Sequence, residues 1–186
     1  MFTYAKVAQA AAFFASKEGG TINIMKLMKL LYLSDRKSMD RYDAPITYDN
    51  FISMDNGPIL SRAYDLANGA CRDAEGAAQW AAWIGGRDQY NIRLKRAIEE
   101  DELDQFSDAD IEVMNSIWDQ FGKYDQWRLS KFTHRFCKEW KHPDNSSIPI
   151  SDVDVFLALG RSQSIARDLA EDIQNEKALD RLFASS

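Results

Sequence analysis

Histidine and cysteine are both scarce in this chain, and their scarcity limits the chemistry that it can carry. The 186 residues include only two of each. Two cysteines cannot form the disulfide framework of a small secreted domain, and reduced thiols fit the cytosol. The one cluster of metal-ligand types is His134, Cys137 and His142. It offers three ligands where a structural zinc site usually has four, so we predict no metal site and no cofactor.

Signature motifs of catalysis are absent as well. The sequence contains no G-x-S-x-G, no H-E-x-x-H and no P-loop. We therefore predict no catalytic residues and a protein that is not an enzyme. One alternative from a different class stays open, a hydrolase or transferase that uses His134 as a base. That alternative requires His134 to meet a partner group in a pocket.

Long apolar runs are missing too. No stretch approaches the roughly 20 residues that a membrane-spanning helix needs. The apolar N-terminal stretch lacks a leading basic region and carries Lys6 and Gln9, which favours an amphipathic helix over a signal peptide. We expect a cytoplasmic protein with no membrane partner.

An excess of basic residues is also lacking. The net charge is −6 at pH 7, from 23 lysines and arginines against 29 aspartates and glutamates. Proteins that hold nucleic acid are normally basic over the binding surface, and no helix-turn-helix module is evident. We therefore do not expect a nucleic-acid partner.

Apolar residues are plentiful, and they follow a helical spacing. They make up 45% of the chain, with 12% aromatic residues, as in a folded globular protein. Ile24, Leu27, Met28 and Leu31 form one stripe, and further leucines widen it. A helix that is apolar over most of its circumference is usually surrounded by others. Residues 24–41 are therefore predicted to form a central helix.

The same spacing predicts a mainly α fold, a single compact multi-helix domain over residues 1–186. Besides the central helix, helices are expected at 4–17, 59–68, 107–121, 126–140, 151–159 and from Ser162 or Ser164 to about 183. The last of these should face inward with Ile165, Leu169, Ile173, Leu179 and Phe183. A small β-hairpin is expected from 80–84 and 89–94, although 80–84 also fits a helix. The C-terminal helices within 151–183 are assigned to the same domain.

Charged residues gather in two places. The central helix carries a basic flank of Lys26, Lys29, Arg36, Lys37 and Arg41. We expect it to be exposed to solvent and paired with neighbouring acids. Residues 99–112 contain eight acidic residues and no basic one. Such a run is more often a solvated face than an active site, and a partner-binding face is the second choice.

The segment 47–56 is the candidate for recognition. It lies between two predicted helices and is bounded by Pro45 and Pro58, and Pro58 is expected to begin the second helix. Loops held by a rigid frame often bind partners, and aromatic residues and methionine are enriched in interface cores. The predicted partner-binding residues are Tyr48, Asp49, Asn50, Met54, Asp55, Asn56 and Arg62. The alternative is that the segment only fills the core, as we expect for Phe51.

Several blocks of this sequence resemble a known family. They are K-L-M-K-L-L-Y-L-S-D at 26–35, P-I-T-Y-D-N-F at 45–51, N-G-P-I at 56–59 and Tyr64, followed by Leu129, Ser130, Thr133, His134 and Trp140. Together they resemble the Panacea antitoxin domain, found in SocA-like and phage-associated GepA-like proteins, and the pattern is clearest over 6–142. Two positions depart from it: Ile59 replaces the usual valine, and Met54 stands near a frequent aromatic position.

The resemblance implies an antitoxin of a bacterial or phage toxin–antitoxin system. Such a protein would neutralise a cognate toxin, encoded by an adjacent gene, by binding it directly. One SocA-like member instead acts as a proteolytic adaptor, so delivery of the toxin to a AAA+ protease is the alternative. The resemblance names neither the toxin nor an oligomeric state.

Overall fold

Helices dominate the structure, as the sequence predicts. The structure is a computed structural model that describes residues 1–184, without the side chains of residues 100 and 180–184. Its helices are α1 (Tyr4–Lys17), α2 (Ile24–Tyr42), α3 (Ser61–Asn68), α4 (Ala74–Trp83), α5 (Asp108–Phe121), α6 (Gln126–Phe136), α7 (Asp152–Ala158) and α8 (Gln163–Ala184), with a 3-10 turn at Glu100–Glu102. Its strands are β1 (Thr21–Asn23), β2 (Phe51–Met54), β3 (Gly57–Leu60), β4 (Ile84–Asp88), β5 (Asn91–Leu94) and β6 (Ile148–Ile150). The fold is mainly α with two small antiparallel sheets.

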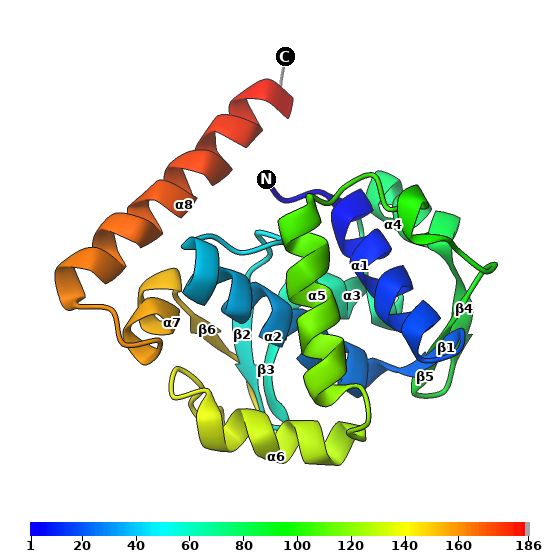
Figure 1. Ribbon diagram of the computed structural model, residues 1–186, viewed down its shortest axis with the longest axis horizontal. Coiled ribbons are helices and arrows are strands. Elements are labelled where there is room, and N and C mark those ends of the chain that lie inside the picture. Colours follow the sequence, from blue (N-terminus) through cyan, green and yellow to red (C-terminus); the bar gives the residue numbers. More distant parts are fainter. Residues whose placement is uncertain (185–186) are drawn as a thin grey trace.

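Helix α2 lies at the centre of the molecule (Figure 1), which confirms the predicted central helix. It begins where the Asn23 side chain accepts a hydrogen bond from the N–H of Met25 at 3.0 Å. It ends at Asp43, whose left-handed backbone (φ of 59°) stops the helix before Pro45. Its apolar residues are buried against α1, α5, α6 and β3, so α2 organises the core.

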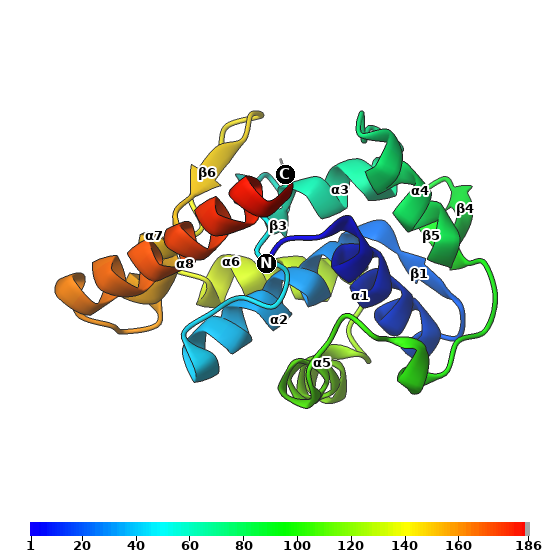
Figure 2. The ribbon, with the colours of Figure 1, turned by 90° about the horizontal axis from the view of Figure 1, so that it is seen from above.

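The two three-stranded sheets lie on different sides of the molecule (Figures 1 and 2). One has the strand order β1-β5-β4 and the other β3-β2-β6. The predicted hairpin is present as β4–β5, but its first strand begins at Ile84, because residues 80–83 complete helix α4. Strands β1 and β6 have three residues each, which is too short for an alternating pattern, and the sequence did not indicate them.

The prediction that Pro58 begins a helix is wrong. Gly57–Leu60 is strand β3, paired with β2, and the helix begins at Ser61. Proline cannot donate to a strand ladder, but β3 lies at the edge of its sheet, where proline is tolerated. The segment 47–56, expected to be irregular, therefore contains strand β2 and ends in a tight hairpin turn at its C-terminal end.

Helix α6 is shorter than predicted. It ends at Phe136, before the predicted end at residue 140, because Cys137 adopts a non-helical conformation. The chain then turns so that the Trp140 indole N–H donates to the carbonyl oxygen of Met54 at 3.0 Å. This hydrogen bond joins the end of α6 to the β2–β3 hairpin.

Helix α8 projects from the rest of the chain (Figure 1). Its buried face consists of Ala166, Ala170 and Ile173, and it packs against α7. Of the residues predicted to face inward, Ile165 and Leu179 are 49% and 54% exposed, so the prediction is wrong for both. Phe183 lies outside the described side chains. The alanines form the contact face because small side chains let two helices approach closely.

The prediction that the basic flank of α2 is exposed holds for Arg41 but is wrong for Lys26 and Lys29. Lys26 and Lys29 are 5% and 1% exposed, because α2 is covered on the faces that carry them. Arg41 does pair with the acidic run, at 2.8 Å from Glu112. The acid Asp35 is also buried within α2.

Burial of Asp35 makes the stability of the fold depend on pH. Desolvation raises the pKa of Asp35 from 3.8 to about 7, although Thr47 donates to the carboxylate from its N–H (2.9 Å) and its hydroxyl (2.5 Å). Between pH 4 and pH 7 the folded chain therefore binds a proton that the unfolded chain has released. The stability from this group is present at low pH and declines as pH rises, by up to about 1.4 kcal/mol per pH unit.

Asp35→Asn is expected to remove this decline. An asparagine can accept from the Thr47 N–H and donate to the Thr47 hydroxyl, but it does not titrate. Urea unfolding of both proteins at pH 4.5, 6 and 8 measures the change in the free energy of unfolding. The variant should lose less stability than the wild type between pH 4.5 and 8. Equal losses would show that Asp35 is ionised in the fold throughout this range.

Candidate functional site

The seven predicted partner-binding residues divide between the two ends of the β2–β3 hairpin. Met54, Asp55 and Asn56 are at its turn, which we call the hairpin tip. Tyr48, Asp49, Asn50 and Arg62 are near its open end, where β2 begins and β3 runs into α3. The structure therefore does not bring the seven residues into one patch.

Asp49, at the open end of the hairpin, is buried and binds backbone N–H groups of the chain. It is 1% exposed, so it is not on the open surface that the prediction required. Its carboxylate accepts hydrogen bonds from the N–H groups of Asn50 (2.7 Å), Arg62 (3.2 Å) and Ala63 (2.9 Å). Arg62 and Ala63 are in the first turn of α3, so Asp49 supplies the acceptor that the free N–H groups of this turn need.

Two other residues at the open end also make contacts within the chain. The half-buried Tyr48 donates its hydroxyl to Glu176 of α8. The Arg62 guanidinium lies 4.1 Å from the centroid of the Phe2 ring. Asn50 is exposed. The role of Tyr48, Asn50 and Arg62 in partner binding stays a prediction.

The hairpin tip is held against α6 and the loop that follows it. The carbonyl oxygen of Asn56 accepts a hydrogen bond from Ser130 Oγ at 2.9 Å. Asp55 Oδ1 accepts one from the N–H of Asn145 at 3.2 Å. The side chains of Asp55 and Asn56 nevertheless remain exposed. The tip thus presents two polar side chains on a backbone fixed from both sides.

A cavity of about 580 Å³ lies beside the hairpin tip. We call it the tip cavity; its lining residues are Asn23, Ile24, Met25, Met28, Lys29, Met54, Asp55, Asn56, Ile59, Tyr64, Asn68, Arg87, Tyr90, Gln126 and Trp127. Three of the six methionines of the chain are among them. Methionine adapts its shape to different partners, which suits a recognition surface.

Most of the tip cavity could not be found from the sequence. Its lining comes from four stretches of the chain: the end of β1 with α2, the β2–β3 hairpin with α3, the β4–β5 hairpin, and α6. Of the predicted residues it includes only Met54, Asp55 and Asn56. Trp127, with 56% of its surface exposed, and the exposed Tyr90 were missed because an isolated aromatic residue gives no positional signal.

Lys29 lies in the wall of this cavity although it is only 1% exposed. Its Nζ donates to the carbonyl oxygen of Pro58 at 2.9 Å. Burial lowers the pKa of Lys29 from 10.5 to about 7. Among the residues that the structure describes, no carboxylate forms an ion pair with it.

The alternative that His134 acts as a catalytic base requires a partner group for it in a pocket, and the described residues do not place one there. The exposed His134 ring stacks on Trp140, with centroids 4.0 Å apart and an interplanar angle of 12°. Partial burial, with Lys29 and His142 nearby, lowers its pKa. Cys137 is buried, whereas His142 is exposed beside Asp144. Within the described residues no group of three or more His, Cys, Asp or Glu side chains is arranged to hold a metal ion.

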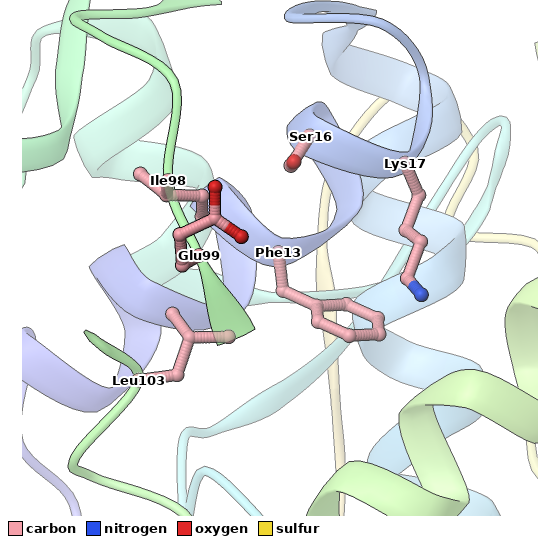
Figure 3. A pocket seen from close by; sticks show the side chains of 6 residues that line it. All are labelled: Phe13, Ser16, Lys17, Ile98, Glu99 and Leu103. Carbon is pink, nitrogen blue, oxygen red and sulfur yellow. The ribbon is translucent and has the colours of Figure 1, made fainter. Parts of the chain in front are cut away.

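The acidic run borders a smaller hollow of about 200 Å³. Figure 3 shows Phe13 and Lys17 of α1 on one side of it and Ile98, Glu99 and Leu103 on the other. Two acidic side chains of the run interact with other residues of the chain. Glu102 Oε1 forms an ion pair with Arg96 Nη2 at 2.6 Å, and Asp104 Oδ1 accepts a hydrogen bond from Gln9 Nε2 at 2.7 Å. This side of the molecule therefore anchors segment 96–105 to α1.

Comparison with known protein families gives a match. The model of the family described as antitoxin SocA-like, Panacea domain, matches residues 27–141. This range contains both sheet-forming hairpins and the cavity lining other than Asn23, Ile24 and Met25. No curated protein and no solved structure matches the chain. Across residues 1–184, none of the helices has the length and apolar character needed to cross a membrane.

Proposed function

Because this chain belongs to the SocA-like, Panacea-domain family of antitoxins, we propose that it neutralises a cognate protein toxin by binding it directly and without catalysing a reaction. The observation that carries the proposal is the family match over residues 27–141. The toxin is expected to be the product of an adjacent gene.

The hairpin tip and the tip cavity support direct binding. Asp55 and Asn56 are exposed on a fixed backbone, and the cavity beside them is rimmed by exposed aromatic side chains, Trp127 and Tyr90. Protein interfaces are enriched in aromatic residues and methionine at their cores. We therefore propose this face of the molecule as the toxin-binding surface.

Co-expression with the product of the adjacent gene tests the proposal. The two proteins should co-purify, and the antitoxin should relieve the growth arrest that the toxin causes. Asn56→Arg, at the hairpin tip, is expected to weaken the complex about tenfold or more, because a long charged side chain would stand in the interface. Isothermal titration calorimetry measures the affinity.

Asn175→Arg on α8 is the matched control, because Asn175 is also exposed but lies away from the tip. It should bind the toxin as the wild type does. Absence of any complex with the wild-type protein, together with unrelieved growth arrest, would reject the proposed function. Wild-type affinity of Asn56→Arg would place the interface elsewhere, and equal weakening by both variants would show that the effect of the added charge is not specific to the hairpin tip.

A proteolytic adaptor that delivers the toxin to a AAA+ protease is the second candidate. Helix α8 favours it, because this helix projects from the molecule (Figure 1) and carries the exposed side chains Ile165 and Leu179, which could serve as a second binding surface. The half-life of the toxin separates the two functions. An adaptor shortens it in cells that contain the protease, whereas a simple binding antitoxin leaves it unchanged or lengthens it.

A further inference from the structure

Two lysines of α2 are buried three residues apart, yet only one of them has a negatively charged partner. Lys26 Nζ lies 2.5 Å from Glu18 Oε2 and donates to the carbonyl oxygen of Gly122 at 2.8 Å. Lys29 Nζ donates to the carbonyl oxygen of Pro58 at 2.9 Å, and no carboxylate of the described residues is paired with it. A buried ammonium group without a counter-charge is costly, and burial accordingly lowers the pKa of Lys29 to about 7. A negatively charged group placed beside Lys29 would favour its protonated form.

Within the described residues, no carboxylate lies within ion-pair distance of Lys29 Nζ. His134 and Cys137 interact electrostatically with Lys29. Burial raises the pKa of the Cys137 thiol to about 12, so this thiol is neutral at pH 7. Gly57 lies close by, since a Cβ built on it would stand 3.1 Å from Lys29 Nζ. Lys29 is also one of the residues that line the tip cavity.

The walls of the tip cavity are suited to an apolar group that carries a carboxylate. Met25, Met28 and Ile59 line it near Lys29, and Trp127 stands at its open side. Its volume of about 580 Å³ falls within the roughly 300–1,000 Å³ of pockets that hold ligands. Arg87, also in the lining, adds a second positive charge, against the single carboxylate of Asp55.

We propose that the tip cavity receives an acidic side chain from an apolar segment of the toxin, and that Lys29 Nζ donates a hydrogen bond to its carboxylate. This inference rests on the proposed function. The bound carboxylate supplies the counter-charge that Lys29 lacks, while the apolar neighbours of the acidic residue contact the methionines and Trp127. A protein segment is the occupant because the cavity adjoins the exposed hairpin tip, which can contact the same partner.

The first experiment compares Lys29→Met with Lys26→Met in the full-length chain. Methionine keeps most of the shape of lysine and removes the ammonium group. Lys29→Met is expected to bind the toxin about 30-fold more weakly or worse, since it leaves a carboxylate of the toxin buried and unpaired. Lys26→Met should bind within about twofold of the wild type, because Lys26 does not line the cavity. Wild-type affinity of a folded Lys29→Met would overturn the inference and leave the proposed function intact.

The second experiment needs neither a variant nor the toxin. The probe is 4-methylpentanoate, a carboxylate with a leucine-sized apolar tail, and its amide is the uncharged control. NMR of lysine labelled at the ε carbon follows the Lys29 resonance. The carboxylate should shift it saturably at millimolar concentration, and the amide should not. No shift with the carboxylate, or equal shifts with both compounds, would overturn the inference even if Lys29→Met failed to fold.

The two experiments together separate the inference from the proposed function. If the toxin complex forms but 4-methylpentanoate does not shift the Lys29 resonance, the cavity is rejected as a carboxylate site and the antitoxin role is retained. If 4-methylpentanoate shifts the Lys29 resonance but no toxin complex forms, the antitoxin role is rejected. In that case the occupant is a small carboxylate and not a protein segment, so the inference as stated is overturned as well.

Discussion

Gly57→Ala is expected to lower the free energy of unfolding by roughly 2–6 kcal/mol, because it combines backbone strain with overpacking of a closed site. Gly57 has a φ of +103°, which side chains rarely tolerate. A Cβ at this position would lie 2.6 Å from Thr133 Oγ1 and 3.1 Å from Lys29 Nζ. Thr133 is fully buried and its hydroxyl is hydrogen-bonded to the carbonyl of Ser130, so it cannot easily move away.

Gly20→Ala is the control that separates strain from contact. Gly20 has a similar φ of +94°, but nothing lies within 4 Å of the position of its Cβ. It should therefore cost only the strain, roughly 1–3 kcal/mol. Urea unfolding followed by tryptophan fluorescence measures both variants. If both variants lose the same free energy of unfolding, the residues around Gly57 must shift to accommodate the added Cβ at little cost.

Leu31→Ala is the second large effect, with an expected loss of about 2–5 kcal/mol, as for a buried leucine whose removal leaves a cavity. Leu31 is 1% exposed in the middle of α2, within the main hydrophobic cluster. Because alanine favours the helix at least as well as leucine, the loss reports packing and not helix propensity. The midpoint of urea unfolding gives the value.

Leu179→Ala makes the same substitution on a helix where the side chain is 54% exposed. Surface substitutions usually change stability by less than about 0.5 kcal/mol. A loss of stability at Leu179 equal to that at Leu31 would mean that α8 is covered in solution by another surface. A small loss at Leu31 would mean that the core around α2 collapses into the cavity left by the substitution.

Local signals account for the parts of the fold that the sequence predicted correctly. The bounds of α1 agree with the prediction. The start of α2 also agrees, because Asn23 supplies a capping oxygen directly before the apolar stripe. The start of α5 agrees because Ser107 and Asp110 form a capping box. Each of these signals involves residues close in sequence, so no knowledge of the fold is needed.

The errors arise where a distant residue takes over a local role. Pro58 has the local chemistry of a helix start, but strand pairing with β2 places it in β3. The carboxylate of Asp49 then provides the acceptor for the first N–H groups of α3. Asp49 was expected at a partner surface because the sequence does not show where α3 begins. Once α3 begins at Ser61, the Asp49 carboxylate binds its first N–H groups and is buried. A local pattern cannot show which of two competing partners a backbone group will have.

The sequence by itself determined that the chain is mainly helical, that α2 is its central element and that it carries the Panacea pattern. Those properties follow from apolar spacing and capping residues along single helices. Only the tertiary structure decided that Lys29, apparently part of an exposed basic flank, is buried beside a cavity. The lining of that cavity comes from four separate stretches of the chain, so its shape and the burial of Lys29 in its wall exist only once those stretches have packed together.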